Sequence, residues 1–225
     1  MTNIAELYSS LLIPDNNVIS QATQALLGLY QIPDTIMPIL AILKNSENAQ
    51  IRQHAAIGLK TILKNHWYGF CTTEYAQSII DDIITSLKNE SEERIRHLII
   101  YALEPISAYR ECPWPKMLDD LALQCIQSDD PAILDTGMHL YEILIPHFSE
   151  KTINYIIDPL VEKISEIFQN CINLVTISAN LIALLFQTLS SPYPACLDDI
   201  TGVIFDGFHK LLIAQFPSIY HISNS

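Results

Sequence analysis

The chain has 225 residues, a length that permits one elongated domain or two small ones. Hydrophobic residues make up 49% of it and charged residues 16%, which excludes intrinsic disorder of the whole chain. Lys and Arg number 12 against 25 Asp and Glu, a net charge of −13 that disfavours binding to nucleic acid or to an anionic membrane. Electrostatics therefore favour a basic partner.

The cysteines and the N-terminus indicate a reducing compartment. The five cysteines lie far apart and contain no CxxC pair, and no basic segment followed by an apolar core opens the chain. We therefore expect a cytosolic or nuclear protein with free thiols. The positions are Cys71, Cys112, Cys125, Cys171 and Cys196.

Apolar residues recur at helical spacing from end to end, and glycine is rare, which predicts a nearly all-α protein. Short polar clusters punctuate the chain and predict helix stops followed by N-caps. One of them, Asp129-Asp130 before Pro131, is typical of an N-cap. The clusters occupy residues 14–17, 45–48, 89–92, 128–131 and 169–173.

A helical pattern repeats after each cluster. The copies begin at Val18, Ile51, Ile95, Ile133 and Leu174, each with an aliphatic residue. Four copies place a small residue four positions on, at Ala22, Ala55, Gly137 and Ser178, with Ile99 as the exception. All five place a large residue eight positions on, at Leu26, Leu59, Leu103, Tyr141 and Ile182. The pattern predicts one buried stripe, with a small position that lets a neighbouring helix approach.

Each of these helices follows another predicted helix, so that the unit is an antiparallel helix pair of about 40 residues. The preceding helices are predicted at 3–13, 34–44, 73–88, 115–127 and 151–169. Such units are typical of HEAT and armadillo arrays, and two helices per unit favour HEAT. We expect a right-handed α-solenoid of five to six HEAT repeats in a single array over residues 1–225.

The end of the chain resembles the first helix of a sixth unit, CLDDITGVIFDGFHKLLIAQF from Cys196. An array that stopped there would expose an apolar face, so we expect the N-terminal part of a longer solenoid, or pairing through that end. A stretch without charged residues between Glu166 and Asp198 is interrupted by polar residues and prolines. It favours a helix buried in the array over a membrane span.

Catalytic and metal-binding patterns are not found in the sequence. It contains no GxGxxG, P-loop, GxSxG or HExxH motif, and its histidines do not pair with ligands at metal-binding spacing. Paired acids adjacent in sequence do not share a helical face. We therefore expect neither an enzyme nor a cofactor or metal site. Arg52 and Arg96 are expected to brace the preceding turns, with contact to a ligand as the alternative.

Negative charge is concentrated in the second half of the chain. Residues 1–110 carry 8 basic and 11 acidic residues, whereas residues 111–225 carry 4 and 14. This distribution would steer a basic protein segment toward the second half. A solvated acidic outer face explains it equally well.

The segment Ala22–Trp67 resembles the N-terminal domain of the importin-β (karyopherin-β) family. The match lies in the pattern IRQ-AA--LK--I---HW, carried by Ile51, Arg52, Gln53, Ala55, Ala56, Leu59, Lys60, Ile62, His66 and Trp67. Farther on, EERIRHLIIYALEPISAYRECPWPKMLDDL, including Trp114-Pro115, resembles the importins that carry histones and ribosomal proteins.

The resemblance implies a nuclear import receptor that shuttles between cytoplasm and nucleus through the nuclear pore. Its implied partners are Ran-GTP, basic protein cargo such as histones or ribosomal proteins, and Phe-Gly nucleoporins, with release of cargo when Ran-GTP binds. The positions that match Ran-facing ones are Gln53, Lys60, Lys64, Arg96 and His97. The alternative function is a HEAT-repeat scaffold or adaptor subunit of a protein complex.

Overall fold

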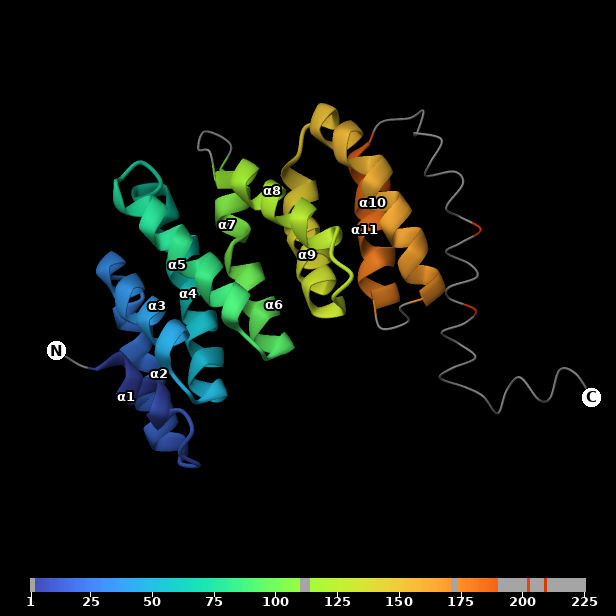
Figure 1. The fold of residues 1–225 in the computed structure, drawn as a ribbon. Coiled ribbons are helices and arrows are strands. Elements are labelled where there is room, and N and C mark those ends of the chain that lie inside the picture. Colours follow the sequence, from blue (N-terminus) through green and yellow to red (C-terminus); the bar gives the residue numbers. More distant parts are fainter. Residues whose placement is uncertain (1–2, 110–113, 171–173, 190–201, 203–208, 210–225) are drawn as a thin grey trace, which may run out of the picture. The chain divides into compact units, whose positions relative to one another are not determined.

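The computed structural model describes residues 3–109, 114–170 and 174–189 and the single positions 202 and 209. These residues form helices joined by short turns, as the sequence predicts (Figure 1). Contacts divide the chain into two units, Met1–Lys116 and Met117–Ser225. The helix predicted from Cys196 lies outside the described residues.

The predicted pairs are present with small shifts at their ends. The first helices are α1 (Ile4–Ser10), α3 (Ile36–Asn45), α5 (Tyr75–Asn89), α8 (Trp114–Ile126) and α10 (Glu150–Asn170). The second helices are α2 (Asn16–Leu29), α4 (Ala49–Phe70), α6 (Glu93–Ala102), α9 (Pro131–Leu144) and α11 (Val175–Thr188). A 3-10 turn, η1 (Pro33–Thr35), precedes α3, and another, η2 (Ile145–His147), follows α9.

Side-chain caps explain where several second helices begin. Asp15, Asn48 and Asp130 each accept hydrogen bonds from the backbone amides two and three residues on, which start α2, α4 and α9. Asp130 is therefore the N-cap that its sequence position predicts. Its neighbour Asp129 has a fully exposed side chain.

The second helix of the third repeat breaks where the pattern predicts continuity. α6 ends at Ala102 and a separate turn, α7 (Glu104–Ser107), follows Leu103. Pro105 explains the break, because it has no amide hydrogen to donate to the carbonyl of Tyr101 and its ring crowds that turn. The helix α6 therefore ends at Ala102, one residue before Leu103, the last position of the buried stripe.

The predicted stripe is confirmed at its small and large positions and only partly at its first position. All five small-position residues, Ile99 included, are buried, and so are the five large ones. At the first position, however, Ile95 and Leu174 are buried, Val18 and Ile51 are half-buried, and Ile133 is 45% exposed. This position lies in the first turn of four of the helices and directly before α11 in the fifth. Burial of Ile133 was therefore a wrong prediction.

In the first unit, α3 packs against α4 and α5, and α4 packs against α6. A close approach between α1 and α4 depends on Gly58. The hydroxyl groups of Tyr8 and Tyr30 hydrogen-bond at 3.1 Å in the core, directly over the Cα of Gly58. A Cβ at Gly58 would collide with the Tyr8 hydroxyl and lie 2.8 Å from that of Tyr30. Burial raises the pKa of both tyrosines, so both hydroxyls stay neutral.

In the second unit, α9 packs against α11, and α10 packs against α11. Gly137 allows α9 to approach α8: a Cβ there would lie 2.8 Å from the backbone nitrogen of Ile126. The small position of this repeat thus has the role that the pattern predicts. Among the described residues no single helix is both long and apolar enough to cross a membrane, and only the pair Asn16–Leu29 with Pro33–Asn45, bent by 119°, meets length and composition together.

Candidate functional site

One face of α4 presents a continuous stripe to solvent. Gln53, Ile57, Lys60 and Lys64 recur every three or four residues, which places them on one side of the helix. Gln53 is half-buried, the two lysines are exposed, and Ile57 is 45% exposed. Sequence reasoning named the three polar positions but missed Ile57. Its signal was the spacing itself, since position 57 completes the i, i+4, i+7, i+11 series.

Lys60 has an ionic neighbour one repeat away. Its Nζ lies 3.5 Å from Oε2 of Glu104, and both side chains are about half exposed. In such a solvated pair the mutual attraction is small, so the lysine can exchange this partner for another acidic group at little cost. The pair nevertheless places the ammonium group of Lys60 beside the start of α7.

Arg96 and His97 lie on α6, the helix that packs beside α4. Both side chains are half-buried. Nη1 of Arg96 donates to the carbonyl oxygens of Glu90 and Ser91, at 3.3 and 3.0 Å, so its charge is directed toward the preceding turn. These are the contacts expected of a turn-bracing residue.

Arg52 makes the same backbone contacts one repeat earlier. Its Nη1 donates to the carbonyl oxygens of Ser46 and Glu47, at 3.0 and 3.1 Å, again five and six residues back. Nε and Nη2 also donate to the two carboxylate oxygens of Glu90, at 2.8 and 2.9 Å. Arg52 therefore braces its own turn and joins it to the next one.

The environment of Glu90 keeps this pair ionised. Burial by itself raises the pKa of Glu90, but hydrogen bonds from Arg52 and from the backbone amides of Ser91 and Glu92 lower it below its ordinary value. Glu90 in turn raises the pKa of Arg52. The turns that precede α4 and α6 are thus held by charge-assisted hydrogen bonds from Arg52 and Arg96.

The Importin-beta N-terminal domain family matches residues 22–103. Residues 22–103 are thus similar to an importin-β N-terminal domain. The resemblance inferred from the residues is thereby confirmed. The matched region begins at Ala22 within α2 and reaches Leu103, the residue that follows α6, and so includes the whole of α4.

Solved structures of the karyopherin Kap121p have a fold similar to that of this chain. Its complex with Ste12p has a TM-score of 0.70 at 14% identity, and its complex with Nup53p has 0.70 at 15%; each covers 95% of this chain and 20% of Kap121p. The complex of Kap121p with the SUMO protease Ulp1p has a TM-score of 0.68 at 15% identity, and the match covers 94% of this chain and 20% of Kap121p. The chain thus spans about one fifth of the length of these karyopherins. No curated protein sequence matches it significantly.

These similarities establish the fold class: an all-α array of HEAT-type helix pairs, as predicted. At 14–15% identity these structural matches show a shared fold and no more. The group of importins that carry histones and ribosomal proteins stays a prediction. So do the boundaries predicted for the domain, residues 22–67, and the single array.

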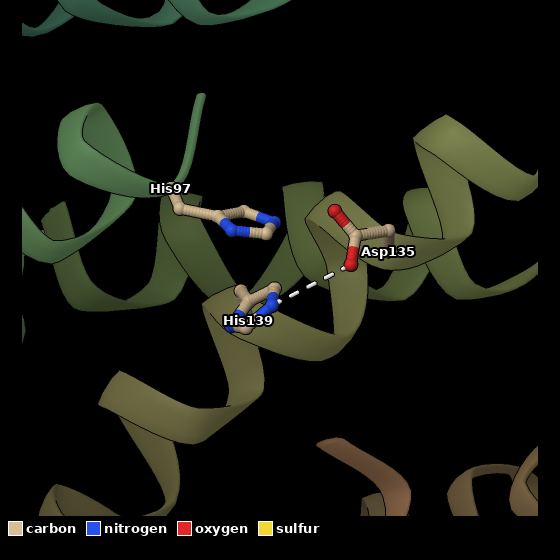
Figure 2. A group of neighbouring side chains, drawn as sticks. All are labelled: His97, Asp135 and His139. Carbon is tan, nitrogen blue, oxygen red and sulfur yellow. Dashed lines mark ion pairs between the residues drawn. The ribbon is translucent and has the colours of Figure 1, made fainter. Parts of the chain in front are cut away.

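Beyond the matched residues 22–103, α9 of the second unit carries a charged cluster. His139 lies between Asp135 and Glu142: Nε2 is 3.4 Å from the Asp135 carboxylate, and Nδ1 is 3.2 Å from that of Glu142. Figure 2 shows the ion pair with Asp135, one helical turn away. Burial lowers the pKa of His139, but the two carboxylates more than offset this and raise it to about 9. His139 is therefore charged at neutral pH.

The Glu142 carboxylate also joins two helices of this unit. Its Oε1 accepts a hydrogen bond from the amide of Asn180 on α11, at 3.3 Å. The cluster thus neutralises part of the negative charge on α9 and ties that helix to α11. Sequence reasoning did not single out His139, although acids three positions after it and four before it are the signal of such a helical cluster.

Proposed function

We propose that this chain is a segment of a nuclear import receptor whose α4 and α6 surface binds GTP-bound Ran. The observation that carries the proposal is the importin-β N-terminal domain over residues 22–103. The resemblance assigns Ran contacts to Gln53, Lys60, Lys64, Arg96 and His97. The domain spans the helices that carry all five.

The chemistry of the α4 stripe supports this assignment. Two exposed lysines follow the partly exposed Ile57 on the same face, so the stripe offers apolar area with positive charge on one side. The net charge of the whole chain is −13, so this basic stripe is a local exception. It suits an acidic patch on a folded partner, with the lysines contributing mainly to the rate of association and its specificity.

The charge of the second unit supports the assignment of basic proteins as cargo. Residues 117–189 contain ten acidic and two basic residues, so their field attracts Lys- and Arg-rich segments. Histones, ribosomal proteins and similar cargo fit this chemistry, with Ran-GTP binding releasing them. The resemblance adds Phe-Gly nucleoporins as partners, passage between cytoplasm and nucleus, and a role without enzymatic activity.

The test is retention of Ran by the immobilised chain, with Ran loaded with GTP in one arm and with GDP in the other, at 50 and 200 mM salt. We expect selective retention of the GTP form, weaker at the higher salt because the lysine contacts are screened. Circular dichroism verifies that the immobilised protein is helical. Equal retention of both forms, or of neither at 50 mM salt, would overturn the Ran assignment and favour the scaffold alternative.

A further inference from the structure

A groove lies in the first unit between the start of α3 with η1, the last turns of α4 and the start of α5, with a cavity volume of about 590 Å³. We call it the tyrosine groove. Its lining includes Asp34, Met37, Asn65, Tyr68, Phe70 and Tyr75. None of the five positions assigned to Ran lines it. The groove is therefore a separate surface, and a ligand bound in it would be independent of the Ran assignment.

The groove gathers large hydrophobic side chains that are exposed to solvent. Tyr68 is 76% exposed, Tyr75 64% and Met37 48%, and all three line this one space. Soluble proteins rarely leave such side chains grouped at the surface without a partner. Exposed tyrosines around an apolar depression are typical of protein-binding sites, where aromatic anchors contribute most of the affinity.

Two of the aromatic rings, those of Tyr68 and Phe70, contact another ring before anything binds. Tyr109 meets Tyr68 edge to face, with ring centroids 5.6 Å apart and planes at 85°. His66 holds Phe70 in the same way at 6.4 Å, and its Nε2 donates to the carbonyl oxygen of Tyr30 at 3.0 Å. A partner would therefore lose little side-chain entropy in ordering these rings.

The charge of the groove indicates the kind of partner. Among the described residues that line it, Asp34 is the one Asp, Glu, Lys or Arg, and it is exposed. A carboxylate beside tyrosine rings attracts Lys or Arg by ion pairing and by contact of the cation with the ring faces. Asn65 adds an exposed amide that can both donate to and accept from a peptide backbone.

We propose that the tyrosine groove binds a segment of a partner protein that inserts a large apolar side chain beside Tyr68 and Tyr75 and places a Lys or Arg against Asp34. The volume accommodates two or three side chains of such a segment. The overall charge of −13 steers the basic residue toward the protein and repels an acidic one. Lys88, an exposed residue at the opposite end of α5 from Tyr75, lies outside the lining.

Methyl NMR of the full chain, labelled at its methionine methyl groups, tests the proposal. The probes are three octapeptides built of Gly and Ser, each with two test residues placed two positions apart. The first carries Leu and Lys, the second carries Leu and Glu, and the third carries Ser and Lys. We expect the Leu/Lys peptide to shift the Met37 signal saturably and the fully buried Met138 to stay unchanged. Its affinity should exceed that of the Leu/Glu peptide about threefold, the effect of one exposed ion pair, and the Ser/Lys peptide should not bind.

Variants separate the two parts of the site. Tyr75→Ala should weaken the Leu/Lys peptide at least about fivefold by removing an aromatic anchor. Asp34→Asn should keep the need for Leu but remove the preference for Lys over Glu. Lys88→Ala, at the opposite end of α5 from Tyr75, is the control and should change neither. Circular dichroism establishes that each variant is folded.

Three results would overturn the proposal, two of them obtained with the unmodified chain. One is a Met37 signal that does not move with 1 mM Leu/Lys peptide. The other is equal binding of the Leu/Lys and Leu/Glu peptides by the unmodified chain. A preference for Lys that survives in Asp34→Asn would place the basic residue elsewhere and would equally contradict the assignment.

Discussion

Arg52 on α4 and Glu90, which follows the end of α5, form a doubly hydrogen-bonded ion pair, with Nε to Oε2 at 2.8 Å and Nη2 to Oε1 at 2.9 Å. The same guanidinium donates to the turn at Ser46 and Glu47. Arg96 repeats this arrangement on the backbone of the turn at Glu90. Each arginine thus holds the turn of its own repeat, and Arg52 joins two successive repeats.

Glu90→Gln should lower the free energy of unfolding by about 3 kcal/mol at pH 7, because it leaves the largely buried Arg52 without its charged partner. The pKa of Glu90 is lowered in the folded state, so its contribution is present above the ordinary value of 4.5 and is lost as pH falls through the folded value. Urea denaturation at pH 7 and pH 3 measures both effects.

The control for that change is Glu47→Gln, which keeps the carbonyl that Arg52 uses and alters only an exposed side chain. It should leave stability nearly unchanged. Equal losses in the two variants would contradict the role of Glu90, as would a Glu90→Gln deficit that stays constant down to pH 3.

Gly58→Ala should destabilise the first unit by about 2 kcal/mol, because the added methyl group collides with the Tyr8 hydroxyl and separates it from Tyr30. Gly28→Ala is the matched control: it lies in α2 with open space around it and should gain about 0.5 to 1 kcal/mol from helix propensity. Thermal unfolding compares them. A neutral or stabilised Gly58→Ala would show that the tyrosine pair is not constrained by this position.

His139 should stabilise the second unit in a pH-dependent way. Its folded pKa of about 9 exceeds the ordinary 6.5, so the contribution is complete below pH 6.5 and disappears as pH rises through 9. The difference in unfolding free energy between the unmodified chain and His139→Gln should therefore shrink by up to about 3 kcal/mol over that window. NMR titration of the imidazole checks the pKa directly; a midpoint at or below 6.5 would refute the cluster's effect.

Lys60→Glu should reduce retention of Ran-GTP about tenfold if the α4 stripe is the binding surface, because it places a negative charge where a positive one is required. The double change Lys60→Glu with Glu104→Lys restores an ion pair within the chain and should restore stability without restoring Ran binding. Lys88→Glu, on the exposed end of α5, is the control and should bind Ran normally. If the double variant recovered Ran binding, the loss in Lys60→Glu would be due to reduced stability and not to a lost contact with Ran.

Asp130→Ala should cost about 1 kcal/mol by removing the cap that accepts from the amides of Ala132 and Ile133. Asp129→Ala, the adjacent residue with a fully exposed side chain, should have little effect. Chemical denaturation distinguishes the two. Similar losses from both changes would mean that charge at the helix start, and not the specific hydrogen bonds, is what matters.

The amino-acid sequence by itself determined the helices, their pairing into repeats and most of the buried stripe. These properties depend on residues within one or two helical turns: a cap such as Asp130 acts on amides two and three residues away, and the stripe recurs at helical spacing. The polar stripe on α4 was predictable for the same reason. The match at Ile51 to Trp67 was local too, since it lies within one helix.

Only the tertiary structure decided which distant residues meet. Arg52 and Glu90 are 38 residues apart, and the pattern placed Arg52 at a turn without naming its acid. Exposure of Ile133, the space above Gly58 and the tyrosine groove each depend on where one helix ends against another. Helical periodicity fixes the direction of a side chain around its own axis but leaves the offset between packed helices free, and that offset is set by the packing of the whole core.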